Sequence, residues 1–315
     1  MLGIRKNPTI YSPVPPPQRS RRRPPRSPWI RNSPGESAAA RRHTADLISE
    51  HPIPSIRLMG TRIDCVTEAE VVARILSDIR QGRGGWVVTP NVDQLRILDQ
   101  RPELRAVVAD ATLMIADGQP LIWASRIQRE PLPERIAGAS LIVSLSAAAA
   151  RVGAGIFFLG GSPGEAEAAI SVLRRDNPEL EVAGVLCPSM GFDRDPDALA
   201  EVRKALQTAN PHIVYTCFGF PKQECVIHEL KPFLPSAWFL GLGGSFSIIS
   251  GRTVRAPRWM QRVGLEWFWR LANEPRRLFA RYIIHDLPFA LRLLLSAIRN
   301  RKPYRHDAPV VGTSV

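Results

Sequence analysis

Polar and glycine-rich segments follow several apolar runs of this 315-residue sequence, and they hold the residues best suited to chemistry. Asp117 comes directly after one such run and precedes a glycine, so its carboxylate is a candidate general base. The same carboxylate could instead cap the helix expected from Gln119. Thr89 and Asn91 follow another apolar run and are able to hydrogen-bond a sugar or Asp117.

The segment 160–164 reads Gly-Gly-Ser-Pro-Gly and opens an expected helix. Glycines such as Gly160 and Gly161 let a ligand approach the backbone, and a helix N-terminus offers free N–H groups to an anion. The full G-x-G-x-x-G spacing is missing, and no acid stands at a strand end about 20 residues further on. The segment is therefore either a nucleotide-binding loop or a plain tight turn.

The segment 219–224 joins an expected strand to a helix that begins near Pro221. Gln223 is a neutral donor and acceptor suited to a nucleobase or a sugar hydroxyl, and Lys222 could contact phosphate or be solvated. Glu224 lies in the first helical turn, where a negative charge is favourable, so we interpret it as structural. Two further glycines end strands where a ligand could approach, Gly219 and Gly243.

Asp193 and Asp195 form a D-x-D pattern, which holds a divalent metal in many sugar-nucleotide transferases. Asp195 precedes a proline, an ordinary arrangement for a helix start, so we predict no metal there. The four cysteines show no C-x-x-C pair and match no zinc spacing, which indicates reduced thiols in or near the core. We accordingly predict neither a metal site nor a bound cofactor.

Short apolar runs alternate with longer amphipathic segments up to about residue 250. This alternation predicts an α/β fold with a Rossmann-like, mostly parallel sheet and helices on both faces. Ligands of such sheets bind beyond the carboxyl ends of the strands, where the segments described above would meet. The capping-box pattern from Thr67 to Glu70 predicts one more helix before the first of these strands. Expected strands are 86–89, 112–115, 156–159, 180–186, 212–218 and 238–242, and expected helices are 91–101, 119–128, 138–151, 163–176, 196–209 and 221–231.

The net charge of +13 belongs to the two ends of the chain. Residues 1–44 and 252–315 each carry +9, whereas residues 45–251 carry −5, a balance that does not favour binding along a nucleic-acid backbone. The predicted organisation is a disordered Pro/Arg-rich tail (1–54), an α/β catalytic domain (55–251), a helical basic appendage (252–302) and a tail (303–315).

The appendage is expected to form helices over 264–272, 275–285 and 287–300, with arginines interleaved among aromatic residues. Its longest apolar run, 287–298, falls short of the roughly 20 residues that a spanning helix needs. The basic N-terminus lacks the apolar segment of a secretory signal.

Several of these segments, in the same order, resemble the WecG/TagA/CpsF family of bacterial glycosyltransferases (glycosyltransferase family 26). The resemblance covers about residues 56–281 and is most specific in the appendage. The segments that carry it are Thr89-Pro90-Asn91, Ala116-Asp117-Gly118, Gly219 to Glu224, Arg255-Ala256-Pro257, Gly264-Leu265-Glu266-Trp267-Phe268-Trp269-Arg270-Leu271, Glu274 to Arg277 and Arg281-Tyr282.

The resemblance implies an inverting, metal-independent transfer of a sugar from a UDP-sugar to a polyprenyl-diphosphate-linked glycan. It implies work at the cytoplasmic face of the membrane, in the synthesis of an exopolysaccharide, capsule, teichoic acid or common antigen. On that pattern Asp117 is the catalytic base, Thr89 and Asn91 are neighbouring site residues, and Gln223 belongs to the donor site. The appendage would meet an anionic membrane and bring arginines to the acceptor diphosphate, namely Arg270, Arg276, Arg277 and Arg281.

Two departures from the family pattern carry no assigned role: Ser247, where relatives often have aspartate, and the basic N-terminal tail. Two other classes of function stay open. A nucleotide-dependent oxidoreductase is disfavoured by the incomplete glycine fingerprint, and a basic-tailed RNA-binding protein is disfavoured by the acidic middle of the chain. The residues identify neither the donor sugar nor the length of the acceptor, and both a monomer and a homo-oligomer fit the sequence.

Overall fold

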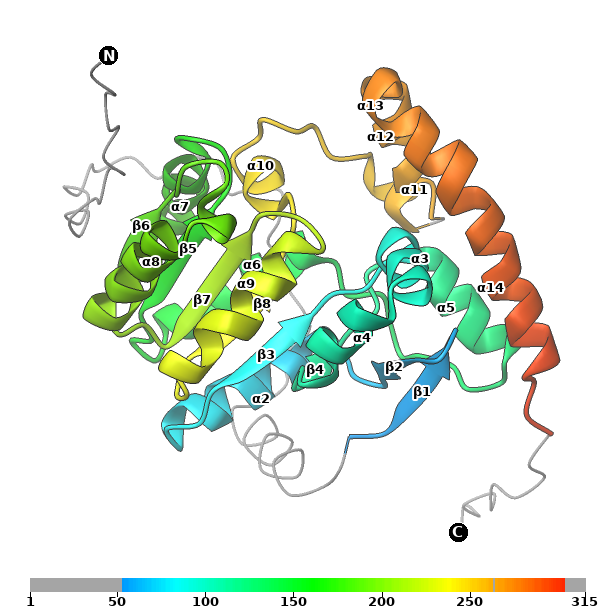
Figure 1. The fold of residues 1–315 in the computed structure, drawn as a ribbon, viewed down its shortest axis with the longest axis horizontal. Helices are drawn as coiled ribbons and strands as arrows, with labels where there is room; N and C mark the ends of the chain where they lie inside the picture. The colour runs from blue at the N-terminus through cyan, green and yellow to red at the C-terminus, as the bar shows by residue number, and fades with distance from the viewer. Residues whose placement is uncertain (1–52, 263, 304–315) are drawn as a thin grey trace, which may run out of the picture.

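The computed structural model describes residues 53–262 and 264–303; the tail predictions for 1–52 and 304–315 lie outside the described residues. The centre of the molecule is a six-stranded sheet in the order β4-β3-β8-β7-β5-β6 (Figure 1). All five pairs of neighbouring strands are parallel, so the predicted α/β class is confirmed. The strands are β3 (Gly85–Val88), β4 (Leu113–Met114), β5 (Ile156–Gly160), β6 (Val182–Leu186), β7 (Ile213–Cys217) and β8 (Trp238–Gly241).

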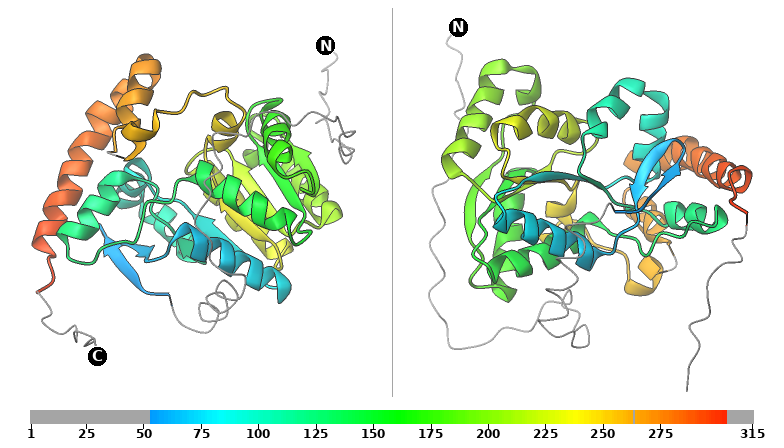
Figure 2. Two further views of the ribbon diagram at one scale, coloured as in Figure 1. Left: turned by 180° about the vertical axis from the view of Figure 1, so that it is seen from behind. Right: turned by 90° about the horizontal axis from the view of Figure 1, so that it is seen from below.

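Helices cover both faces of the sheet (Figure 2), because successive strand residues point to opposite sides. On β3, Val87 enters one apolar core, while Trp86 and Val88 enter the other. The first core is closed by α2 (Glu68–Arg80), α6 (Gly138–Ala150), α7 (Glu165–Asp176) and α10 (Ser245–Ile249). The second is closed by α3 (Val92–Gln100), α4 (Pro102–Ala109), α8 (Pro196–Ala209) and α9 (Lys222–Leu230).

The helix that follows β3 and the helix that follows β8 lie on opposite faces of the sheet. The same holds for α7 after β5 and α9 after β7. A crevice opens at the carboxyl edge of a parallel sheet where neighbouring connections leave in opposite directions. The segments in which the sequence predicts site residues lie at these two places.

Before β4, the structure differs from the sequence prediction in two places. A two-stranded antiparallel hairpin, β1 (Ser55–Leu58) and β2 (Thr61–Asp64), precedes α2 and was not expected. Its four-residue strands are too short for alternation to stand out against the background. The helix expected over 91–101 is followed by a second helix, α4, because Pro102 favours a first helical position and starts a new axis.

The C-terminal appendage (residues 252–302) is helical throughout its regular elements. Its last helix, α14 (Leu287–Arg299), lies beside α5 (Gln119–Ile127) (Figures 1 and 2). Phe289, Leu293 and Ala297 of this helix are buried in a third apolar core with residues of α5 and the hairpin. Its elements are α11 (Arg258–Arg262), α12 (Glu266–Asn273), α13 (Pro275–Phe279), the π-helical segment Ala280–Asp286 and α14 (Leu287–Arg299).

Candidate active site

Thr89 and Asn91 follow β3 at the carboxyl edge of the sheet, beside the end of β8. The Thr89 hydroxyl is buried and donates a hydrogen bond of 2.9 Å to the Gly241 carbonyl, which ties the end of β3 to the end of β8. The Asn91 side chain caps α3, because its Oδ1 accepts from the Gln94 N–H at 3.1 Å. Both residues therefore shape this edge of the sheet, and the α3 cap uses the amide oxygen of Asn91 and not its two N–H donors.

Asp117 lies beside these residues, on the loop that follows β4. Its backbone N–H donates to the Pro90 carbonyl at 2.8 Å, which joins the two loops. Gly118 occupies the N-cap position of α5 and no side chain caps this helix, so Asp117 does not act as the cap. A β-carbon added at Gly118 would lie 3.6 Å from Asn91 Cβ, which shows how closely the two loops approach.

The Asp117 carboxyl group is held away from solvent, and this burial raises its pKa from 3.8 to about 6. The nearby Arg135 guanidinium and the Gly138 N–H at the start of α6 counteract part of that rise. At neutral pH the carboxylate is therefore mostly ionised but more basic than an exposed one. A general base is most effective when its pKa lies near the working pH, so this environment suits the predicted role.

Three charged side chains that the sequence prediction missed surround Asp117. Arg135 lies on the loop before α6, Arg255 in the segment that joins α10 to α11, and Glu266 in the first turn of α12. Glu266 pairs with Arg135 at 3.1 Å and with Arg255 at 3.4 Å. Arg255 and Glu266 stand inside family-like motifs, but no local pattern singles out Arg135, whose partner is 131 positions away.

Gln223 connects α9 to the loop after β8. Its side chain is fully buried, with Oε1 accepting from the Gly243 N–H at 2.9 Å and Nε2 donating to Glu224 at 2.9 Å. Burial raises the pKa of Glu224 to about 8, so this carboxyl group is mainly neutral at pH 7. Gln223, held by Glu224, therefore fixes the backbone of the loop after β8. A β-carbon added at Gly243 would meet no atom within 4 Å, so this part of the loop is open.

The glycine-rich loop after β5 approaches β7 closely. A β-carbon at Gly160, whose φ is +96°, would lie 2.7 Å from the Cys217 carbonyl, and the Gly161 N–H donates to that carbonyl at 2.8 Å. Glu165 already places a carboxylate in this loop, where it accepts from the Ser162 N–H at 3.0 Å. Two of the backbone N–H groups that the sequence suggested for anion binding, those of Gly161 and Ser162, thus donate to acceptors within the protein.

The D-x-D pair is engaged in contacts within the protein. Asp193 forms an ion pair of 2.7 Å with Lys222, whose ammonium group also lies over the Phe192 ring. Asp195 caps α8 by accepting from the backbone N–H groups of the helix, as the sequence predicted. Within residues 53–262 and 264–303, no group of three or more His, Cys, Asp or Glu side chains is placed to hold a metal ion.

The four cysteines are free thiols, as predicted, but they do not all lie in or near the core. Cys217 is buried, and Cys65 and Cys187 are half-buried. Cys225 is exposed, because it points outward from the first turns of α9 between the buried Glu224 and Val226.

Of the four arginines predicted to bind the acceptor diphosphate, two form ion pairs with carboxylates of the protein. Arg281 pairs with Asp93 at 2.8 Å, and Arg277 pairs with Glu274 at 2.5 Å. Arg276 is exposed, and the buried Nε of Arg270 has no hydrogen-bond partner among the described residues. The structure therefore places all four on α12, α13 and the π-helical segment, with Arg281 tied to the start of α3 beside Asn91.

The appendage also carries an exposed apolar face. Five side chains at helical spacing are each about half exposed, at 46–57 %, while the opposite side of α14 is buried. Among the described residues, no helix combines the length and apolar character needed to cross a membrane. The exposed apolar face consists of Ile284, Leu287, Leu291, Leu295 and Ile298.

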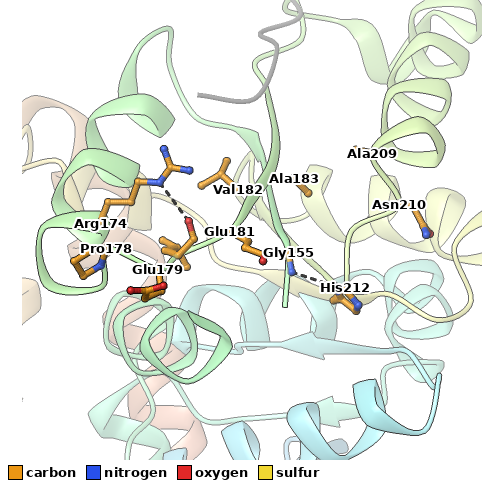
Figure 3. A pocket seen from close by; sticks show the side chains of 11 residues that line it. Gly155, Arg174, Pro178, Glu179, Glu181, Val182, Ala183, Ala209, Asn210 and His212 are labelled. Atoms are coloured by element: carbon orange, nitrogen blue, oxygen red, sulfur yellow. Dashed lines mark hydrogen bonds between the residues drawn. The ribbon is translucent and has the colours of Figure 1, made fainter. Parts of the chain in front are cut away.

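A shallow pocket lies at the opposite edge of the sheet, near the amino ends of β5, β6 and β7 (Figure 3). In it, His212 Nδ1 accepts a 3.1 Å hydrogen bond from the Gly155 N–H, and Arg174 Nε donates to the Leu180 carbonyl at 3.3 Å. Ligands of open parallel sheets bind at the carboxyl edge, so the crevice around Asp117 is the better candidate.

Comparison with known proteins identifies the family of the chain. A sequence model described as "Glycosyl transferase WecG/TagA/CpsF family" matches residues 56–303. An N-acetylglucosaminyldiphosphoundecaprenol N-acetyl-beta-D-mannosaminyltransferase of Bacillus spizizenii is 34% identical over 197 residues, which are 62% of this chain and 74% of that enzyme. The Bacillus subtilis enzyme of the same name is 34% identical over 171 residues, 54% of this chain and 64% of that enzyme, just under two thirds.

Proposed function

Because the chain belongs to the WecG/TagA/CpsF family of glycosyl transferases, we propose that it moves a sugar from a UDP-sugar to a polyprenyl-diphosphate-linked glycan. The observation that carries the proposal is Asp117 at the carboxyl edge, a partly exposed residue whose carboxyl group is held away from solvent, beside Thr89 and Asn91. The names of the two relatives make N-acetylmannosamine the first donor sugar to test, with N-acetylglucosaminyl-diphosphoundecaprenol as the acceptor.

In the proposed reaction Asp117 removes the proton from an acceptor hydroxyl group. The resulting oxygen attacks the anomeric carbon of the sugar from the side opposite to UDP, and the bond between that carbon and the diphosphate breaks. The electron pair of that bond leaves with UDP, and the configuration at the anomeric carbon inverts. An α-linked donor then gives a β-linked product, the linkage that both relatives' names state.

Negative charge that develops on the departing diphosphate needs preorganised donors. Arg135 and Arg255 stand beside Asp117, and the open backbone around Gly219 and Gly243 can be approached closely by a ligand. Guanidinium groups bind diphosphate oxygens in pairs, so these arginines and those of the appendage are the proposed support for the two diphosphates.

The raised pKa of Asp117 predicts an acid limb in the pH profile. The base works only when ionised, so kcat/KM is expected to fall as the pH drops through about 6, the pKa given by burial. An exposed aspartate would put this limb near 4. Initial rates between pH 4.5 and 8 with a fixed UDP-sugar measure it, and a flat profile down to pH 5 contradicts the proposed environment.

Removal of divalent metal is expected to leave most of the activity. The D-x-D pattern of Asp193 and Asp195 is committed to Lys222 and to the α8 cap, and cations of the chain are proposed to support the leaving group. Rates with excess chelator should stay within about twofold of the untreated enzyme. A loss of more than about tenfold that added magnesium or manganese restores contradicts metal-independent transfer.

The exposed apolar face of α14 is proposed to dock on an anionic membrane surface. Its leucines and isoleucines would enter the interface, and Arg299 and Arg301 at the end of the helix are exposed to meet acidic headgroups. A polyprenyl acceptor is itself embedded in a membrane, so this contact would bring the crevice to its substrate.

A direct assay decides the function. Purified protein is incubated with a panel of UDP-sugars and a polyprenyl-diphosphate-linked N-acetylglucosamine, and the products are identified by mass. Addition of one sugar to the acceptor, with release of UDP, is expected for one member of the panel. Binding of a nicotinamide cofactor with no transfer would instead favour an oxidoreductase.

A further inference from the structure

Glu266 bridges two arginines that come from distant parts of the chain. Its Oε2 pairs with Arg135 at 3.1 Å, and its Oε1 lies 3.4 Å from Arg255 Nε. All three side chains are less than one fifth exposed, at 18%, 10% and 19% for Arg135, Arg255 and Glu266. An ion pair that is largely removed from solvent is screened little, so its geometry and charge act on its neighbours.

The approach of α12 to the site explains this bridge. Gly264, with φ of +80°, lies so close to α5 that an added β-carbon would be 2.6 Å from Gln119 Cγ. Two residues later Glu266 reaches the loop before α6. That loop is itself fixed beside the aspartate, because the Ile136 N–H donates to the Ala116 carbonyl at 2.9 Å.

Three charged side chains act on the Asp117 carboxyl group: Arg135 from the loop before α6, Arg255 from the segment before α11 and Glu266 from α12. The Gly138 N–H at the start of α6 also hydrogen-bonds to it. Arg135 thus stands near two carboxylates, those of Asp117 and Glu266. Its ion pair with Glu266 therefore affects how strongly its positive charge acts on Asp117.

We propose that Glu266 is a positioning residue for the transfer reaction, which holds Arg135 and Arg255 beside Asp117 so that the carboxylate stays free of a direct ion pair. This inference rests on the proposed function only in giving Asp117 its role as base. With Glu266 in place, the two guanidinium groups are oriented and the negative charge of Glu266 keeps Asp117 basic. Without it, Arg135 is expected to turn to Asp117 and to lower the basicity of that carboxylate.

Replacement Glu266→Gln tests the inference through the pH profile. The variant keeps the size of the side chain but loses its charge, so the midpoint of the acid limb of kcat/KM should move down by about half a pH unit or more. kcat at neutral pH should fall by about tenfold, because the base becomes weaker and Arg135 is misplaced. Glu266→Asp keeps the charge and should keep the wild-type midpoint.

A control for charge alone is Glu130→Gln, which breaks another ion pair between the body and the appendage, that of Glu130 with Lys302. Its midpoint should match that of the wild type. Arg135→Gln is a second variant that does not depend on the folding of Glu266→Gln, and it should move the midpoint in the opposite direction, upward. An unchanged midpoint in either Glu266→Gln or Arg135→Gln would overturn the inference.

Titration of the Asp117 carboxyl by NMR, with isotope-labelled aspartate and Asp117→Asn for assignment, gives a reading without turnover. The resonance should titrate at lower pH in Glu266→Gln than in the wild type. If the Asp117 titration shifts in Glu266→Gln but the wild-type protein transfers no sugar, the proposed function is wrong and the electrostatic effect of Glu266 on Asp117 stands. If the wild-type protein transfers sugar but the Asp117 titration does not shift in Glu266→Gln, only the positioning role is wrong.

Discussion

Asp117→Asn is expected to lower the kcat of sugar transfer by about 10²- to 10⁴-fold, the usual contribution of a positioned general base. The amide keeps the shape of the side chain but cannot accept the proton of the acceptor hydroxyl. Affinity for UDP should change little, because the base acts on the acceptor rather than on the nucleotide. Stability should not suffer, since burial already disfavours the ionised carboxylate, as its pKa of about 6 indicates.

The measurement is a set of initial rates at pH 7.5 together with UDP binding by calorimetry and a melting curve. Asp110→Asn is a matched control, because it makes the same chemical change at an exposed position. Wild-type turnover in Asp117→Asn would remove the base assignment. Loss of UDP binding together with a lowered melting temperature would instead show that Asp117 is needed for folding.

The sheet was predictable because its strands are fully buried and its helices amphipathic. Ile213–Cys217 and Trp238–Gly241 contain only buried residues, and such runs between helical segments are typical of a parallel sheet. The hairpin was not predictable, because Ser55–Leu58 buries only two of its four residues, and it does so against α5 and α14. Of these two helices, α5 begins more than 60 positions further along the chain, and α14 lies further still.

The site was predictable where it depends on strand ends and not where it depends on long-range pairing. Asp117 was found because a carboxylate after a buried strand and before a glycine stands at the ligand-binding edge. Arg135 was missed, since an arginine in a loop gains meaning only when Glu266, 131 positions away, is placed beside it. Tertiary contacts of this kind leave no periodic signal in the sequence.

Residue type alone also left the partners of the predicted polar residues undetermined. Gln223 has the expected donor and acceptor groups, but its carbonyl oxygen holds the Gly243 N–H and its amide faces Glu224. Lys222 has the expected charge, yet Asp193 neutralises it at 2.7 Å. A polar side chain in a predicted site satisfies its hydrogen bonds within the protein whenever the fold brings a partner close enough.

The double replacement Leu291→Glu and Leu295→Glu is expected to remove binding to anionic lipid vesicles. Each leucine is 57% exposed on the outer side of α14, so the replacement leaves the buried Phe289 and Leu293 in contact with α5. Burying a leucine side chain is worth about 1.5–3 kcal/mol, and two charges would have to enter the interface in its place. Vesicle sedimentation should therefore show at least about a hundredfold weaker partition.

The same variant separates membrane docking from catalysis. If α14 serves only to reach the acceptor, transfer to a water-soluble, short-chain acceptor should stay near the wild-type rate, whereas transfer to a long-chain acceptor in vesicles should collapse. Val152→Glu with Met190→Glu adds the same charge at two exposed apolar positions outside the appendage, and should bind vesicles normally. Docking through this face is wrong if both double variants sediment alike, because the charge change alone would then explain any effect. High salt should weaken wild-type binding only in part, since apolar burial is not screened while the contacts of Arg299 and Arg301 with acidic headgroups are.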